Sequence, residues 1–180
     1  MMTTQHAVPP PTTAELGPRL LALLAGLHGP DDLAPGAIER ITGVAVRHDP
    51  ADAGRYGFGL PLEPGWMCHL SALPAAEGAP PKRLVISYDA SGGDDAALPP
   101  SVPALDDVAR ALVDAGYRRD PVFGPRNVLW GQVFTRDDVE IRVNVEAEDP
   151  AADTVRPRVT RIAVDAALGT GTFAGGLRHE

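Results

Sequence analysis

The stretch VEIRVNVE, residues 139–146, decides the fold, because apolar and polar side chains alternate along it without exception. Successive side chains of a β-strand point to opposite faces of the sheet, so one face of this strand is wholly apolar. The other face carries four polar side chains, Glu140, Arg142, Asn144 and Glu146. Such a strand is typical of an antiparallel sheet with one buried face and one solvent-exposed face.

The residues around this strand complete a unit that spans residues 101–166. Further strands are predicted at residues 128–134 and 158–164, on either side of the alternating strand. A helix is predicted before them, because apolar side chains recur at helical spacing between a candidate N-cap and a terminating glycine: Ser101, Leu105, Val108, Leu112 and Gly116. The unit is therefore one helix followed by antiparallel strands.

A fainter copy of this unit occupies residues 12–90. The segment RHDP at residues 47–50 matches RRDP at 118–121, and ISYDA at 86–90 matches IAVDA at 162–166. The helices and strands of this copy are expected at residues 12–29, 35–42, 44–47, 56–62, 66–73 and 82–88. Gly17 and Pro18 leave the start of the first helix open between Thr12 and Pro18.

Helices gathered before sets of hairpin-connected strands predict an α+β fold. We expect two tandem helix-plus-antiparallel-strand units, residues 12–90 and 101–166, that form a sheet covered by helices on one face. A flexible N-terminal tail, a linker and a C-terminal tail complete the chain, at residues 1–11, 91–100 and 167–180.

The composition limits the classes of partner. The 180 residues carry a net charge of −8, which argues against nucleic-acid binding and favours a basic partner or a neutral ligand. No apolar run approaches the roughly 18–20 residues that cross a bilayer, so we expect a soluble chain without a membrane span. No signal peptide is expected, which predicts a cytoplasmic protein, or a periplasmic one if a signal sequence has been removed.

The sequence contains no pattern that predicts catalysis or metal binding. Cys68 and His69 are neighbours on a predicted strand, so their side chains point to opposite faces and cannot form a nucleophile and base pair. Cys68 is the only cysteine and is expected in the core. The five histidines lack metal-ligand spacing: His6, His28, His48, His69 and His179.

The segment GTGTFA at residues 169–174 matches a dinucleotide-binding glycine pattern. That pattern requires a following helix whose N-terminus faces the pyrophosphate, and only a few residues follow here. We therefore predict no cofactor and a flexible tail.

The predicted open face of the sheet provides the candidate binding residues. If the two units lie side by side, this face presents polar side chains from both of them: Met67, His69, Ser71, Glu140, Arg142, Asn144 and Glu146. Alternation places Trp66 in the core with Cys68 and Leu70, whereas Trp130 is a candidate interface anchor. This mixture of side chains favours recognition over chemistry.

The repeated helix-plus-strand pattern, over about residues 33–165, resembles tandem α/β-repeat inhibitors such as the β-lactamase inhibitor proteins, and bacterial toxin-neutralising immunity proteins. The resemblance implies a non-catalytic protein-binding module that occludes the active site of a toxin or enzyme. Two alternatives remain open. One is an enzyme whose site is assembled from scattered residues such as His48, His69, Glu140 and Arg142, and the other is a ligand-binding accessory domain.

Overall fold

The computed structural model describes residues 11–62, 65–90, 102–146 and 157–167. The helices in these ranges are α1 (Thr13–Ala25), α2 (Pro35–Thr42) and α3 (Leu105–Asp114), with short 3-10 helices η1 (Pro30–Leu33) and η2 (Pro125–Asn127). The strands are β1 (Arg47–Asp49), β2 (Asp52–Pro61), β3 (Trp66–Pro74), β4 (Pro81–Ala90), β5 (Arg118–Phe123), β6 (Leu129–Arg136), β7 (Val139–Glu146) and β8 (Arg158–Asp165).

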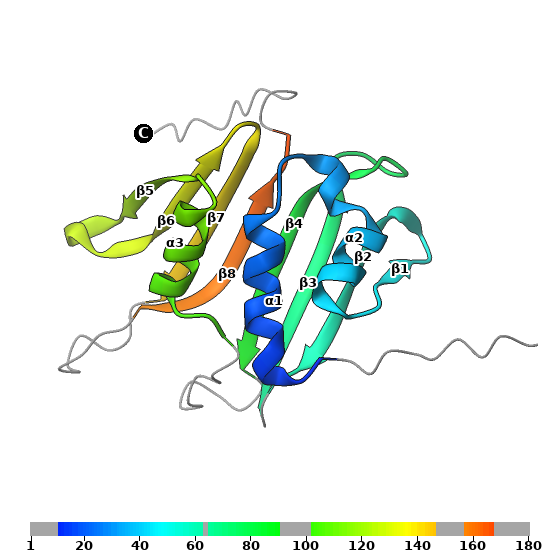
Figure 1. Ribbon diagram of the computed structural model, residues 1–180, viewed down its shortest axis with the longest axis horizontal. Coiled ribbons are helices and arrows are strands. Elements are labelled where there is room, and N and C mark those ends of the chain that lie inside the picture. The colour runs from blue at the N-terminus through cyan, green and yellow to red at the C-terminus, as the bar shows by residue number, and fades with distance from the viewer. Residues whose placement is uncertain (1–10, 63–64, 91–101, 147–156, 168–180) are drawn as a thin grey trace, which may run out of the picture.

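All eight of these strands form one antiparallel sheet with the order β1-β2-β3-β4-β8-β7-β6-β5. Two four-stranded meanders, β1–β4 and β5–β8, therefore meet where β4 pairs with β8, with Ile86 opposite Ile162. The three α-helices lie against one face of this sheet (Figure 1). The other face carries no helix in the part of the chain that the structure describes.

The expected fold class of two tandem helix-plus-antiparallel-strand units is wrong. Two α-helices precede the first four strands and one precedes the last four, and all the strands belong to a single sheet. A four-stranded meander on its own would leave the backbone N–H and C=O groups along its last strand unpaired. Because β4 and β8 are the last strands of the two meanders, their pairing satisfies these groups on both strands. The core is correspondingly shared, because buried side chains from both meanders belong to one cluster.

Helix α1 supplies the largest part of the helical side of this core. Its backbone begins at Thr13, where the amide of the preceding residue, Thr12, donates a 2.9 Å hydrogen bond to Glu15 Oε2. Pro18 lies inside the helix rather than at its start. The expected apolar stripe is confirmed, since these side chains are at most 1% exposed: Leu16, Leu20, Leu23, Leu24 and Leu27.

Two side chains of the second meander fasten the C-terminal end of α1. The hydroxyl of Tyr117 donates to the carbonyl of Leu27 at 2.9 Å, and the guanidinium of Arg136 donates to Ala25 O at 3.1 Å and also to Leu27 O. The last carbonyls of a helix have no partner within the helix, so these donors satisfy groups that would otherwise be buried unpaired. The position of α1 thus depends on Tyr117, just before β5, and on Arg136 of β6, which are about a hundred positions away in sequence.

Most strand predictions are confirmed within a few residues, and two are not. The alternating strand 139–146 is β7, and its Val139, Ile141 and Val143 are fully buried. The first strand begins at Arg47 rather than Val44. The sequence analysis assigned residues 118–121 no strand, yet they begin β5, which is an edge strand exposed along its whole length.

Several predicted features lie outside the described residues. They are most of the two tails, the linker, the candidate N-cap Ser101 and the glycine pattern at residues 169–174. Within the ranges that are described, no helix is long and apolar enough to cross a membrane.

Candidate functional site

The face of the sheet opposite the helices is the candidate site, and we call it the open face. All seven predicted binding residues lie on it, because they alternate with buried neighbours on β3 and β7. The structure does not bring the two groups into contact, since β4 and β8 lie between them. Three interstrand steps of about 4.8 Å separate β3 from β7 by about 14 Å. The predicted set therefore forms the two flanks of a wider surface.

The centre of the open face was missed by the sequence analysis. It consists of alternate residues of β4 and β8: Arg83, Val85, Ser87, Asp89, Arg161, Ala163 and Asp165. Their alternation with buried residues such as Ile86 and Ile162 could have assigned them to this face. Only the strand order could place them between the two predicted groups.

Ion pairs neutralise most of the charge on the open face. Arg83 Nε lies 3.7 Å from Asp165 Oδ2, and Arg142 Nε lies 2.5 Å from Glu140 Oε1. His69 Nε2 lies 3.7 Å from Asp89 Oδ2. Exposed pairs of this kind contribute about 0–1 kcal/mol each to stability, so their main effect is on the charge that a partner meets.

A further pair closes the end of the open face. Arg158 Nη2 donates to Glu146 Oε2, and the Arg158 guanidinium lies 5.5 Å from the ring centre of Trp66. Trp66 itself is 3% exposed, which confirms its predicted place in the core. Arg158 therefore connects the exposed carboxylate of Glu146 with the buried ring of Trp66.

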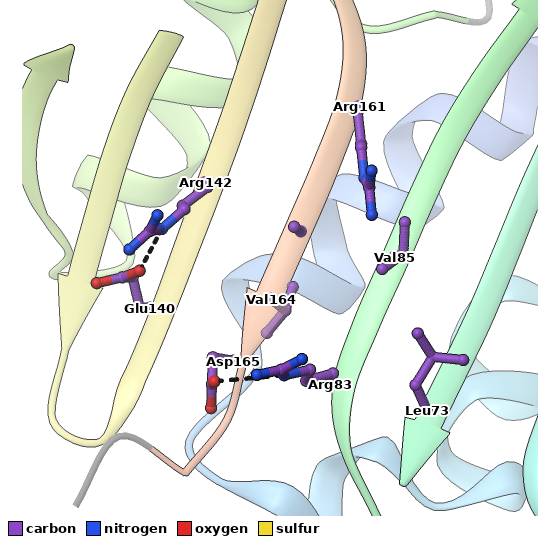
Figure 2. Close-up of a pocket in the computed structure, with 9 residues that line it drawn as sticks. Leu73, Arg83, Val85, Glu140, Arg142, Arg161, Val164 and Asp165 are labelled. Atoms are coloured by element: carbon purple, nitrogen blue, oxygen red, sulfur yellow. Dashed lines mark hydrogen bonds and ion pairs between the residues drawn. The ribbon is translucent and has the colours of Figure 1, made fainter. Parts of the chain in front are cut away.

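A hollow of about 300 Å³ lies in the middle of the open face, and we call it the central hollow. Figure 2 shows the ion pairs Arg83–Asp165 and Glu140–Arg142 beside it, with Arg161 extending toward Val85 on the neighbouring strand. Its wall combines apolar and charged side chains: Leu73, Val85, Ala163, Val164, Arg83, Arg142, Arg161, Glu140 and Asp165. This volume is comparable to one or two amino-acid side chains.

The hairpin that joins β5 to β6 carries an exposed apolar surface, which we call the hairpin patch. Its four side chains are 40–55% exposed: Val122, Phe123, Val128 and Trp130. The indole of Trp130 lies against the backbone of Gly124, where an added Cβ would be 1.9 Å from the ring. Trp130 is therefore held in place by the turn although it is exposed to solvent.

The hairpin patch is continuous with the open face. A second hollow of about 350 Å³ brings Val122 and Trp130 together with Arg142 and Asn144 of β7. The patch therefore adds an apolar region at one side of a largely polar surface. The sequence analysis singled out Trp130 but not the cluster around it.

The structure does not assemble the scattered residues of the enzyme alternative into one cluster. His48 is on β1, where Nδ1 lies 3.3 Å from Ala53 O and the ring lies 5.1 Å from that of Tyr56. Five interstrand steps, about 24 Å, separate that strand from Glu140 and Arg142 on β7. The described residues contain no group of three or more His, Cys, Asp or Glu side chains arranged to hold a metal ion.

Cys68 is fully buried, as predicted, on the helix side of the sheet. Burial, reinforced by the charge of Asp89, raises the pKa of its thiol to about 12. The protonated thiol is a weak nucleophile. The site on the open face therefore does not include Cys68.

We predict that Cys68→Ser lowers the free energy of unfolding by about 1 kcal/mol, because a hydroxyl replaces a packed thiol. The native thiol stays protonated while the unfolded thiol ionises near pH 8.5, so alkaline pH favours unfolding. Between pH 8 and 9.5 the wild type should lose about 1 kcal/mol relative to the variant. Urea titrations of both proteins at the two pH values measure this difference. Equal pH dependence in both proteins would contradict the prediction.

Comparisons with protein-family models, with curated proteins and with solved structures find no match to this chain.

Proposed function

We propose that this chain is a non-catalytic protein-binding module that acts as an inhibitor or immunity protein and occludes the active site of a bacterial toxin or enzyme. The observation that carries the proposal is the continuity of the hairpin patch with the open face through the hollow beside Trp130. Protein–protein interfaces combine an apolar, aromatic-rich region with adjoining polar side chains, as this surface does.

The residue types of this surface support the proposal. Tryptophan and arginine are enriched among the side chains that contribute most to protein–protein binding, and Trp130 and Arg142 line the same hollow. Gly124 fixes the Trp130 ring against the turn, so little conformational entropy is lost when a partner covers it. The exposed aliphatic side chains Val122 and Val128 extend the apolar area.

The charge distribution favours binding over catalysis. The carboxylates of Glu140 and Asp165 are each ion-paired with an arginine, and that of Asp89 lies beside the imidazole of His69. The net charge of −8 favours a partner of positive net charge, because opposite charges accelerate encounter.

The experiment is quantitative affinity purification from extracts of the source cell, followed by mass spectrometry and by a growth assay with the captured protein co-expressed. Trp130→Ala should reduce the captured partner at least 10-fold, since truncation of a central tryptophan commonly costs about 2 kcal/mol or more. Gly124→Ala should act in the same direction, because the added Cβ displaces the Trp130 ring without removing it.

Val113→Ala is the matched control. Val113 is an exposed apolar residue, 47% accessible, but it lies on α3 and outside both hollows. Its replacement should leave capture and protection unchanged. Capture that is equally strong in the Trp130→Ala and wild-type proteins would overturn the proposed interface, and a captured protein whose toxicity is unaffected would overturn the inhibitor role.

A further inference from the structure

The four central strands of the sheet are β3, β4, β8 and β7. Among the charged side chains that these strands place on the open face, Arg161 is the one without an ion-pair or hydrogen-bond partner among the described residues. Three of the carboxylates there are ion-paired with other arginines, Asp165 with Arg83, Glu140 with Arg142 and Glu146 with Arg158, and Asp89 lies 3.7 Å from the imidazole of His69. Arg161 is exposed and takes part in no hydrogen bond or ion pair with this described part of the chain. Arg161 is thus the arginine of this face that has no ion pair with a described carboxylate.

The surroundings of Arg161 form a site of defined shape. Its register neighbours are Ser87 on β4 and Asn144 on β7, which are small or neutral side chains. Figure 2 shows its guanidinium beside Val85, over the central hollow. Arg161 also lines a second depression toward Trp66 and Tyr88. The guanidinium is therefore reachable by a group that enters the central hollow.

A partner that covers the open face has to compensate this charge. Removing an arginine from water without supplying an anion costs free energy, whereas a carboxylate can accept two parallel N–H hydrogen bonds from the planar guanidinium. The carboxylates within the hollow, Glu140 and Asp165, are already ion-paired with Arg142 and Arg83. A partner that covers the hollow can therefore supply the anion for Arg161.

We propose that the central hollow accepts an acidic side chain from a loop of the partner protein, with its carboxylate on Arg161 and its methylene groups on Val85 and Ala163. The inference rests on the proposed function, since it assigns the chemistry of one contact in that interface. The hollow of about 300 Å³ fits one such side chain with its flanking backbone. In a partner of positive net charge, a single acidic contact at this point would determine how the two proteins are aligned in the complex.

The test is an NMR titration of the ¹⁵N-labelled full chain with three blocked dipeptides, acetyl-Leu-Glu-amide, acetyl-Leu-Gln-amide and acetyl-Leu-Lys-amide. The Glu peptide should perturb the amide signals of Val85, Ser87, Arg161 and Ala163. The Gln and Lys peptides should bind at least 10-fold more weakly. Arg161→Gln should weaken binding of the Glu peptide at least 10-fold, and Arg161→Lys should restore part of it.

Arg119→Gln is the matched control, because Arg119 is an exposed arginine on β5 and does not line the central hollow. It should leave the titration unchanged. Titrations with sodium acetate and inorganic phosphate complete the set, and equal perturbation by either ion would reduce the site to a general anion site and overturn the proposal. Glu-peptide binding that survives Arg161→Gln would also overturn it.

The outcomes separate this inference from the proposed function. If the Glu peptide fails to bind while Trp130-dependent capture persists, the protein-binding function stands and the acidic contact is wrong. If the Glu peptide binds through Arg161 while the amount of captured partner does not depend on Trp130, the carboxylate site stands and the proposed interface is wrong.

Discussion

Arg136→Ala is expected to lower the free energy of unfolding by about 3–5 kcal/mol. The Arg136 guanidinium donates to the carbonyls of Ala25, the last residue of α1, of Leu27 just beyond it, and of Ala115 just after α3. It also lies 4.3 Å from the ring centre of Tyr117. One side chain thus joins both helix ends to β6.

The physical reason is that alanine leaves these three carbonyls without their charged donor. Hydrogen bonds to a charged group contribute about 1.5–3 kcal/mol each, and a buried acceptor without a partner adds its desolvation cost. The positive charge of Arg136 also interacts favourably with the negative, C-terminal ends of the dipoles of α1 and α3. The cation–π contact with Tyr117 would be lost as well.

Thermal and urea unfolding of Arg136→Ala, Arg136→Lys and wild type measure this effect. For a chain of this length the alanine variant should melt about 6–20 °C lower. The lysine variant should recover only part of the loss, because a single ammonium group cannot reach both helix ends as the several N–H groups of the planar guanidinium do. Arg119→Ala, on the exposed edge strand β5, should change stability by less than about 0.5 kcal/mol. A melting temperature of Arg136→Ala within 2 °C of wild type would contradict this account, on the scale of about 2–4 °C per kcal/mol.

Gly57→Ala is expected to lower the free energy of unfolding by about 2–4 kcal/mol. Gly57 lies on β2 opposite Ser71, and a Cβ added to it would lie 2.0 Å from the carbonyl oxygen of Leu70 on β3. The obstacle is backbone of a paired strand, so relief requires the two strands to separate. The hydrogen bonds between β2 and β3 would lengthen as a result.

Gly59→Ala provides the matched control on the same strand and the same face. There the nearest atom to an added Cβ is Nδ1 of His69, at 3.1 Å, and that imidazole is exposed and can turn aside. The substitution should leave stability within about 1 kcal/mol of wild type, because alanine also restricts the unfolded chain. Urea midpoints of the two variants give the comparison. Equal destabilisation by both would show that strand glycine in general, rather than the close approach at Gly57, is responsible.

The sequence determined the local elements of this protein because their signals are local. The alternation in residues 139–146 and the helical spacing of Leu105, Val108 and Leu112 depend on the backbone period of a strand and a helix alone. The same periodicity placed Trp66 and Cys68 in the core and assigned the seven candidate binding residues to one face. The hairpin-type order of strands also agreed with an antiparallel sheet.

Only the tertiary structure decided how these elements combine. The pairing of β4 with β8 joins residues about 80 positions apart and merges the strands of the two expected tandem units into one eight-stranded sheet with a shared core. Strand alternation assigns a residue to a face but says nothing of its neighbour on the next strand. The central position of Arg161, its lack of a counter-charge and the exposure of Trp130 beside Arg142 all depend on that lateral order, because they are properties of side chains that meet across strands.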